Sequence, residues 1–221
     1  TALECDALLL AVGRTPNIEG LGLESAGVET TQHGIAVNDR LRSTNRRIYA
    51  CGDVCLPAQF THAADFAART VVQNALFFGR GRYSALTIPR CTYTEPEIAA
   101  VGLSEREAAQ RGIEIDTWHQ PLADIDRAIT DGNETGFVKI HTARGRDTIL
   151  GATIVDTHAG ESISEISVAM AAGMGLGRLA RVIHPYPTRA EAIRKLGDAF
   201  NRTRLTPRVA RIFDRFLAWR R

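Results

Sequence analysis

A glycine followed by an aspartate, directly after a short β-prone run, is the most informative chemical signal in this chain. Residues 48–50 (Ile-Tyr-Ala) are predicted to form a buried strand, which Gly52 ends. Asp53 then stands at the carboxyl end of that strand, the end that faces the ligand crevice in open α/β sheets. A carboxylate there can accept hydrogen bonds from ribose or ribitol hydroxyls. The same pattern also occurs in plain loops, where Asp53 would cap the next segment.

Two further segments carry groups suited to a nucleotide-like ligand. A helix predicted within residues 59–79, buried on most sides, opens with Phe60, Thr61, His62 and Ala63. Backbone N–H groups at a helix N-terminus suit the electron-rich edge of a ring, although His62 can equally start the helix without contacting a ligand. An apolar strand predicted over residues 7–12 ends in Gly13 and Arg14. This arginine can face a nicotinamide nucleotide or a neighbouring carboxylate.

The cysteines favour structural roles. Their positions are Cys5, Cys51, Cys55 and Cys91, and four cysteines in 221 residues do not indicate a secreted disulfide scaffold. The C-x-x-x-C spacing of Cys51 and Cys55 is neither the C-x-x-C redox motif nor part of a metal-ligand pattern. We therefore predict no metal site and a cytoplasmic protein.

Charge is distributed unevenly along an otherwise ordinary composition. The chain is 44% hydrophobic and 24% charged, and no apolar run approaches the roughly 20 residues of a membrane span. Residues 202–221 contain seven arginines and one aspartate, a net charge of +6, which leaves −4 for the preceding 201 residues. Apolar residues in this tail recur at helical spacing. Such a helix docks on a neighbouring domain or rests on an anionic membrane surface. Nucleic-acid binding is not expected, because no aromatic platform accompanies the charge.

The order of predicted elements indicates two different folds in succession. Residues 1–84 have an α/β pattern, including a hairpin-like stretch at 34–39, and end in a linker at 78–84. Residues 85–200 contain strands followed by helices, which favours an α+β layer with an antiparallel sheet. The predicted strands are 91–94, 98–102, 113–122, 136–142 and 148–156. The predicted helices are 104–111, with a Ser104–Glu107 capping box, then 161–172, 176–182 and 189–200. Residues 201–221 form the basic helix.

Taken in order, these motifs resemble the pyridine nucleotide-disulfide oxidoreductases, flavoenzymes that include dihydrolipoamide dehydrogenase, glutathione reductase and mercuric reductase. The likeness runs from about residue 6 to residue 198, through ALLLAVGRTPN, RIYACGDV, the helix that follows and IPRCTYTEPEIAAVGLSE. The resemblance implies that Asp53 and residues 60–63 contact FAD, with Gly52 letting the backbone approach. It also implies that NAD(P)H reduces the flavin, and that residues 85–200 are the interface domain of a homodimer.

The resemblance also gives a role to residues 184–191, His-Pro-Tyr-Pro-Thr-Arg-Ala-Glu. In the disulfide reductases a matching H-x-H-P-T…E segment provides a histidine–glutamate pair that exchanges protons with the redox thiols of the other subunit. Here Tyr186 replaces that histidine and Glu191 is retained, so both are candidate catalytic residues. A phenol with an ordinary pKa of ~10 is a poor general base at neutral pH. The tyrosine therefore favours a mercuric-reductase-like enzyme, in which a tyrosine in this region can meet a soft metal ion.

Other interpretations of this segment stay open. Thr188 and Glu191 have the spacing of a capping box, so Glu191 can simply tie down a helix start. His184 has no metal-ligand partner at helical spacing and is expected to be a packed or surface histidine. The chain ends without the cysteine pair of a true mercuric reductase, so the electron acceptor is predicted only as a small molecule or a metal ion.

We interpret the chain as the C-terminal part of an FAD-dependent NAD(P)H oxidoreductase. No G-x-G-x-x-G follows a predicted strand, so the dinucleotide fingerprints and the redox cysteines of the family are expected upstream in a longer protein. The alternative is a stand-alone dimerising interaction module with a basic tail that binds a membrane or a partner.

Overall fold

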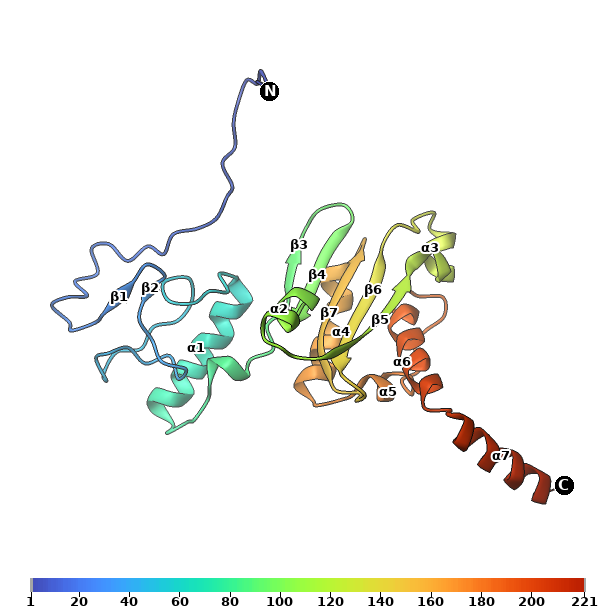
Figure 1. Cartoon of the computed structure of the whole chain (residues 1–221). Coiled ribbons are helices and arrows are strands. Elements are labelled where there is room, and N and C mark those ends of the chain that lie inside the picture. Colours follow the sequence, from blue (N-terminus) through green and yellow to red (C-terminus); the bar gives the residue numbers. More distant parts are fainter. Residues whose placement is uncertain (1, 221) are drawn as a thin grey trace. The chain divides into compact units, whose positions relative to one another are not determined.

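The computed structural model describes residues 2–220, which form two compact units, Thr1–Leu86 and Thr87–Arg221 (Figure 1). In the first unit, residues 7–12 run as an extended segment outside any sheet, and Leu9 is 87% exposed. The prediction of a buried strand there is therefore not borne out. A buried strand needs hydrogen-bonded neighbours on both sides, and no described residues pair with this segment.

The rest of the first unit combines a small hairpin with one long helix. Strands β1 (Thr30–Thr31) and β2 (Gly34–Ile35) pair antiparallel. Residues 48–50 do not form the predicted strand: Tyr49 makes one isolated bridge to Arg42, because turns on both sides leave too few residues for a ladder. A short 3-10 helix, η1 (Tyr83–Ala85), ends the unit. Two small cores form around Val28, Ile35 and Ala50, and around Leu41, Leu56 and Ala67.

Helix α1 (Thr61–Leu76) is less buried than its sequence predicts. Its buried residues are Ala63, Ala67 and Thr70, whereas Phe66 is 55% exposed. The prediction of a helix buried on most sides is thus wrong for the described residues. Its apolar composition requires more partner surface than residues 2–86 supply.

The second unit is built on one antiparallel sheet of five strands in the order β3-β4-β7-β6-β5. The strands are β3 (Arg90–Thr92), β4 (Glu97–Gly102), β5 (Ile115–Pro121), β6 (Phe137–Ala143) and β7 (Ile149–Asp156). Alternate residues of each central strand face one core, because side chains alternate across a sheet; they include Val101, Val138, Ile140, Ala152 and Ile154. The predicted antiparallel α+β layer is confirmed.

Helices cover that core face. Helix α4 (Ala159–Ala171) packs on β4 and β7, and α6 (Glu191–Thr203) packs on β5 and β6 (Figure 1). Shorter elements complete the unit: α2 (Glu105–Gln110), the 3-10 helix η2 (Leu122–Asp124), α3 (Asp126–Thr130) and α5 (Leu176–Leu179). The predicted capping box is present, since Ser104 Oγ accepts from the Glu107 N–H and Glu107 Oε2 accepts from the Ser104 N–H.

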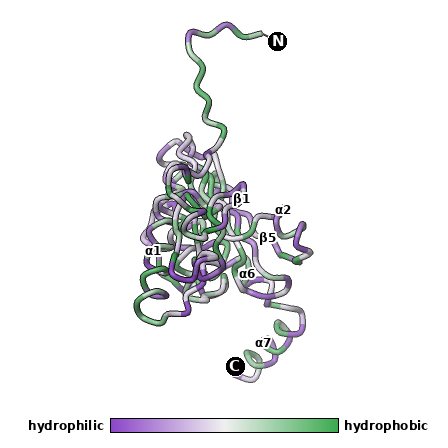
Figure 2. The backbone as a smooth tube through the Cα atoms, turned by 90° about the vertical axis from the view of Figure 1, so that its left-hand side faces the viewer, coloured by the Kyte–Doolittle hydropathy of each residue, from purple (hydrophilic) through white to green (hydrophobic). Residues whose placement is uncertain are grey.

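The basic tail forms helix α7 (Pro207–Arg220), none of whose described residues is buried. Hydrophobic and hydrophilic residues alternate along it at short intervals (Figure 2). Most of its apolar residues are exposed, among them Ile212 at 67% and Trp219 at 82%. No helix within residues 2–220 has the length and apolar character needed to cross a membrane.

Candidate functional site

The Gly52–Asp53 turn presents a carboxylate at the surface of the first unit. Gly52 has φ +79°, a conformation that suits glycine, and its carbonyl accepts from the N–H groups of Cys55 (3.1 Å) and Leu56 (3.0 Å). The Asp53 side chain is 49% exposed. Both sheets among the described residues are antiparallel, so Asp53 lies on an exposed turn and not at the mouth of a parallel sheet.

Arg14 connects this turn to the segment that precedes α1. Its Nη1 donates to the Gln59 carbonyl at 2.8 Å and lies 3.8 Å from Asp53 Oδ2. Of the two partners predicted for Arg14, a nicotinamide nucleotide or a neighbouring carboxylate, the structure shows the carboxylate, and it is that of Asp53. Gly13, with φ +137°, allows the chain to turn just before Arg14. The Arg14 side chain remains 66% exposed and so stays accessible to a ligand.

The N-terminus of α1 has the features of an anion-accepting helix end. Phe60 is the N-cap residue and makes no side-chain cap, and the first turn contains no acidic residue. The rings of Phe60 and His62 stack with centroids 5.3 Å apart. Thr61 is exposed at the first position, and Ala63 is buried beneath the turn. The first N–H groups of a helix have no intrahelical partner, so a ligand with partial negative charge is favoured there.

These groups fit a flavin by the chemistry of their donors and acceptors. An exposed carboxylate can accept from ribitol hydroxyls, and N–H groups at a helix start can donate to the pyrimidine edge of the ring. The Cys55 thiol nearby is half-buried. Burial, and secondarily Cys51, raises the pKa of Cys55 to about 12, so this thiol stays protonated at neutral pH. Among residues 2–220 no group of three or more metal-ligating side chains gathers.

In the second unit, Tyr186 is exposed but its hydroxyl is engaged. Its side chain is 72% exposed, and Oη donates to Asp126 Oδ2 at 2.8 Å. The hydrogen bond and the charge of Asp126 raise the pKa of Tyr186, and the charge of Glu191 adds a smaller effect in the same direction. The phenol is therefore neutral near pH 7, and because its one proton is donated to Asp126, only its acceptor lone pairs remain for a ligand.

Glu191 lies at the start of α6 and is mostly buried. Its Oε1 pairs with Arg194 at 3.0 Å and lies 4.0 Å from Lys195, whereas Oε2 is buried without a hydrogen-bond partner among the described residues. The capping-box interpretation is wrong, because the N-cap residue is Ala190 and Thr188 Oγ1 donates to the Pro185 carbonyl. An unsatisfied buried carboxylate oxygen is rare in folded proteins and calls for a functional explanation.

His184 is a packed histidine. Its Nε2 lies 2.8 Å from Glu165 Oε1, its Nδ1 lies 3.0 Å from the Val182 carbonyl oxygen, and the side chain is 6% exposed. Neither this partner nor Asp126 could be found from local sequence patterns. Asp126 lies 60 positions before Tyr186, and nothing in the spacing of the two residues connects them.

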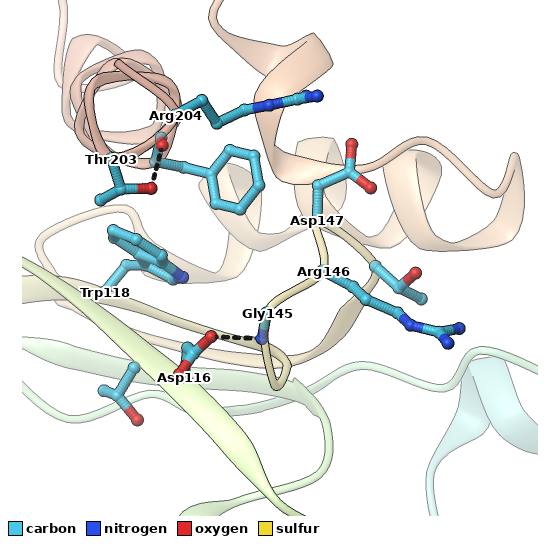
Figure 3. A pocket seen from close by; sticks show the side chains of 10 residues that line it. Asp116, Trp118, Gly145, Arg146, Asp147, Thr203 and Arg204 are labelled. Carbon is cyan, nitrogen blue, oxygen red and sulfur yellow. Dashed lines mark hydrogen bonds between the residues drawn. The ribbon is translucent and has the colours of Figure 1, made fainter. Parts of the chain in front are cut away.

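The second unit also contains a cavity of about 770 Å³ that includes none of the predicted site residues. It lies between β5, the β6–β7 turn and the end of α6, with Trp118 beneath Thr203 (Figure 3). Asp116 closes one side by accepting from the Gly145 N–H at 2.7 Å. We assign it no role in the candidate site.

The described residues thus comprise a first unit with an exposed Gly–Asp turn and a second unit built on a five-stranded antiparallel sheet covered by helices. The chain belongs to the pyridine nucleotide-disulphide oxidoreductase family. Residues 1–69 match that family's model, and residues 88–196 match the model of its dimerisation domain.

Named relatives agree with this assignment. The mercuric reductase of Staphylococcus aureus is 36% identical over 201 residues, which cover 90% of this chain and 37% of that protein. The mitochondrial dihydrolipoyl dehydrogenase of Dictyostelium discoideum is 37% identical over 202 residues, covering 90% and 41%. Among solved structures, the HOCl-induced flavoprotein disulfide reductase RclA of Escherichia coli superposes with a TM-score of 0.78 at 29% identity, covering 87% and 45%. The chain therefore spans less than half of the length of these relatives.

Proposed function

We propose that this chain is the C-terminal part of a cytoplasmic, homodimeric, FAD-dependent NAD(P)H oxidoreductase of the mercuric-reductase-like type. Residues 1–84 contribute part of the nucleotide and flavin domains, residues 85–200 the subunit interface, and residues 201–221 a basic tail that contains helix α7. The observation that carries the proposal is the exposed Asp53 carboxylate, which Arg14 joins to the segment preceding α1. FAD held by these residues would supply a ring able to accept hydride from NAD(P)H and to pass electrons towards the acceptor.

Each predicted residue of the first unit has a defined task in this proposal. Asp53 accepts hydrogen bonds from the ribitol hydroxyls, and Gly52 lets the backbone approach the ligand. Gly13 and Arg14 face the nicotinamide nucleotide, and Arg14 also holds the Asp53 carboxylate in position. The α1 segment that contacts the electron-rich ring edge comprises Phe60, Thr61, His62 and Ala63.

Tyr186 and Glu191 border the acceptor site in this proposal. The neutral, exposed phenol suits coordination of a metal ion or hydrogen bonding to a small molecule better than proton abstraction from a dithiol. Glu191 borders the site from the start of α6, where Arg194 and Lys195 hold its Oε1. Two kinds of relative have a metal ion in their names: the mercuric reductases, and RclA, which is described in a Cu(II) complex.

The proposal is tested with the full-length protein under anaerobic conditions. NADH or NADPH is expected to bleach the visible flavin band in a stopped-flow experiment, and Hg²⁺, Cu²⁺ or a quinone is expected to restore it. A chromophore that neither pyridine nucleotide reduces would contradict the oxidoreductase assignment. Sedimentation of the same preparation should give the mass of a dimer.

We also propose a peripheral membrane contact through α7. Its exposed apolar residues are Ile212, Phe213, Phe216, Leu217 and Trp219. Arg208, Arg211 and Arg215 follow one another at helical spacing and border this apolar face. The helix lies outside both matched ranges, 1–69 and 88–196, so the shared dimerisation domain does not account for it. Basic charge beside an apolar face with tryptophan is typical of helices that lie on anionic bilayers.

Vesicle sedimentation of the 221-residue chain tests this contact. Changing Arg208, Arg211 and Arg215 to glutamine should weaken binding to phosphatidylglycerol-containing vesicles on the order of 100-fold, at about 1 kcal/mol for each arginine. The matched control changes the exposed Arg40, Arg46 and Arg47 of the first unit and should change little. Equal binding to purely neutral vesicles, or self-association in place of binding, would contradict an anionic-lipid contact.

A further inference from the structure

The hydroxyl of Tyr186 is fixed by a carboxylate on a rigid part of the second unit. Asp126, which accepts this hydroxyl at 2.8 Å, opens helix α3. The backbone around Asp126 is anchored, because the side chains of Leu122, Ile125 and Ala128 are fully buried in the main core. A side chain that is 72% exposed would otherwise sample several rotamers, and each ordered rotamer costs conformational entropy.

A second contact joins the same loop to the segment that follows α3. Arg189, three residues after Tyr186, donates to Asp156, to Asp131 Oδ2 at 3.4 Å and to the Asn133 carbonyl at 3.3 Å. The Arg189 side chain is 11% exposed, so this ion-paired contact is largely shielded from water. The Arg189 contacts hold the loop in place. The hydrogen bond to Asp126 therefore has a separate effect, which is to orient the phenol of Tyr186.

We infer that Asp126 is a positioning residue of the proposed acceptor site, which directs the free lone pairs of Tyr186 Oη towards a bound acceptor. The inference rests on the proposed role of Tyr186. A phenol has one O–H donor and two acceptor lone pairs. With the proton committed to Asp126, Oη presents only electron pairs to the site. The acceptor that fits is therefore a cation, or a small molecule that offers an N–H or O–H group.

The first test is a phenolate absorbance titration of the 221-residue chain, with a Tyr186→Phe variant to isolate this residue from the other tyrosines. Tyr186 should titrate above its ordinary pKa of ~10, because negative charge beside it disfavours the phenolate. Asp126→Asn should lower the midpoint, whereas the matched control Asp124→Asn should leave it in place. An unchanged midpoint in Asp126→Asn would overturn the inference.

The second test uses the full-length protein with Hg²⁺ as the acceptor. Asp126→Ala should lower kcat/KM for Hg²⁺ about tenfold and leave flavin reduction by NAD(P)H unchanged. Combining it with Tyr186→Phe should add little to the loss of Tyr186→Phe alone, because the two residues act through one group. No effect of Tyr186→Phe would contradict the proposed acceptor role itself. A loss in Tyr186→Phe without one in Asp126→Ala would contradict only the positioning role.

Discussion

Asp53→Ala in the full-length protein is expected to weaken FAD binding by about 10- to 100-fold. A hydrogen bond to a charged group contributes roughly 1.5–3 kcal/mol, and alanine removes the acceptor for the ribitol hydroxyls. The Asp53 side chain is half-exposed and has Arg14 at 3.8 Å, so its loss should not unfold the first unit. Titration of the apoprotein with FAD, followed by flavin fluorescence, measures the effect.

A matched control separates this effect from a general loss of surface charge. Asp65 lies on the same unit, in α1, and its exposed carboxylate pairs only with Arg69 in the described part of the chain. Asp65→Ala should keep the wild-type affinity for FAD. Equal affinities of the Asp53 variant and the wild type would show that the Gly52–Asp53 turn does not contact the flavin.

Tyr186→Phe is expected to slow reoxidation of the reduced flavin by Hg²⁺ on the order of 10- to 100-fold, because the ring remains while the coordinating oxygen is lost. Reduction of the flavin by NAD(P)H should keep its wild-type rate. Stopped-flow measurement of the two half-reactions distinguishes these steps. Because the pKa of Tyr186 is raised, its protonation state is constant through neutral pH, and the ratio of wild-type to variant rates should not change there.

Tyr93 offers the control for this variant. It is 81% exposed and lies in the second unit after β3, so Tyr93→Phe removes a phenolic hydroxyl without approaching the loop of Tyr186. Both half-reactions should proceed normally in that variant. Slower reduction of the flavin in Tyr186→Phe would place the residue on the nicotinamide side and contradict its acceptor role.

The second unit could be predicted from local patterns. The β-prone segments at 136–142 and 148–156, with a short turn between them, indicate an antiparallel pair. The Ser104–Glu107 capping box marks the start of α2 within a residue. Turn and capping signals involve residues only a few positions apart, so they can be recognised directly in the sequence. The resemblance to the family likewise depends on contiguous motifs.

The first unit and the finer geometry of the acceptor loop could not be predicted in the same way. Residues 7–12 have the composition of a buried strand, but strand pairing depends on partners that local sequence does not specify. Asp126 and Tyr186 meet across 60 positions. Their contact depends on how the fold brings α3 next to the loop that precedes α6, and no local spacing rule predicts this. The same holds for the pairing of Arg189 with Asp156.

The identity and amount of chromophore released from the denatured full-length protein test the central claim most directly. We expect one FAD per chain in wild type and a substoichiometric amount in Asp53→Ala after gel filtration. A colourless wild-type protein that takes up no FAD, although folded and dimeric, would contradict the assignment of the Asp53 turn and the start of α1 to a flavin site.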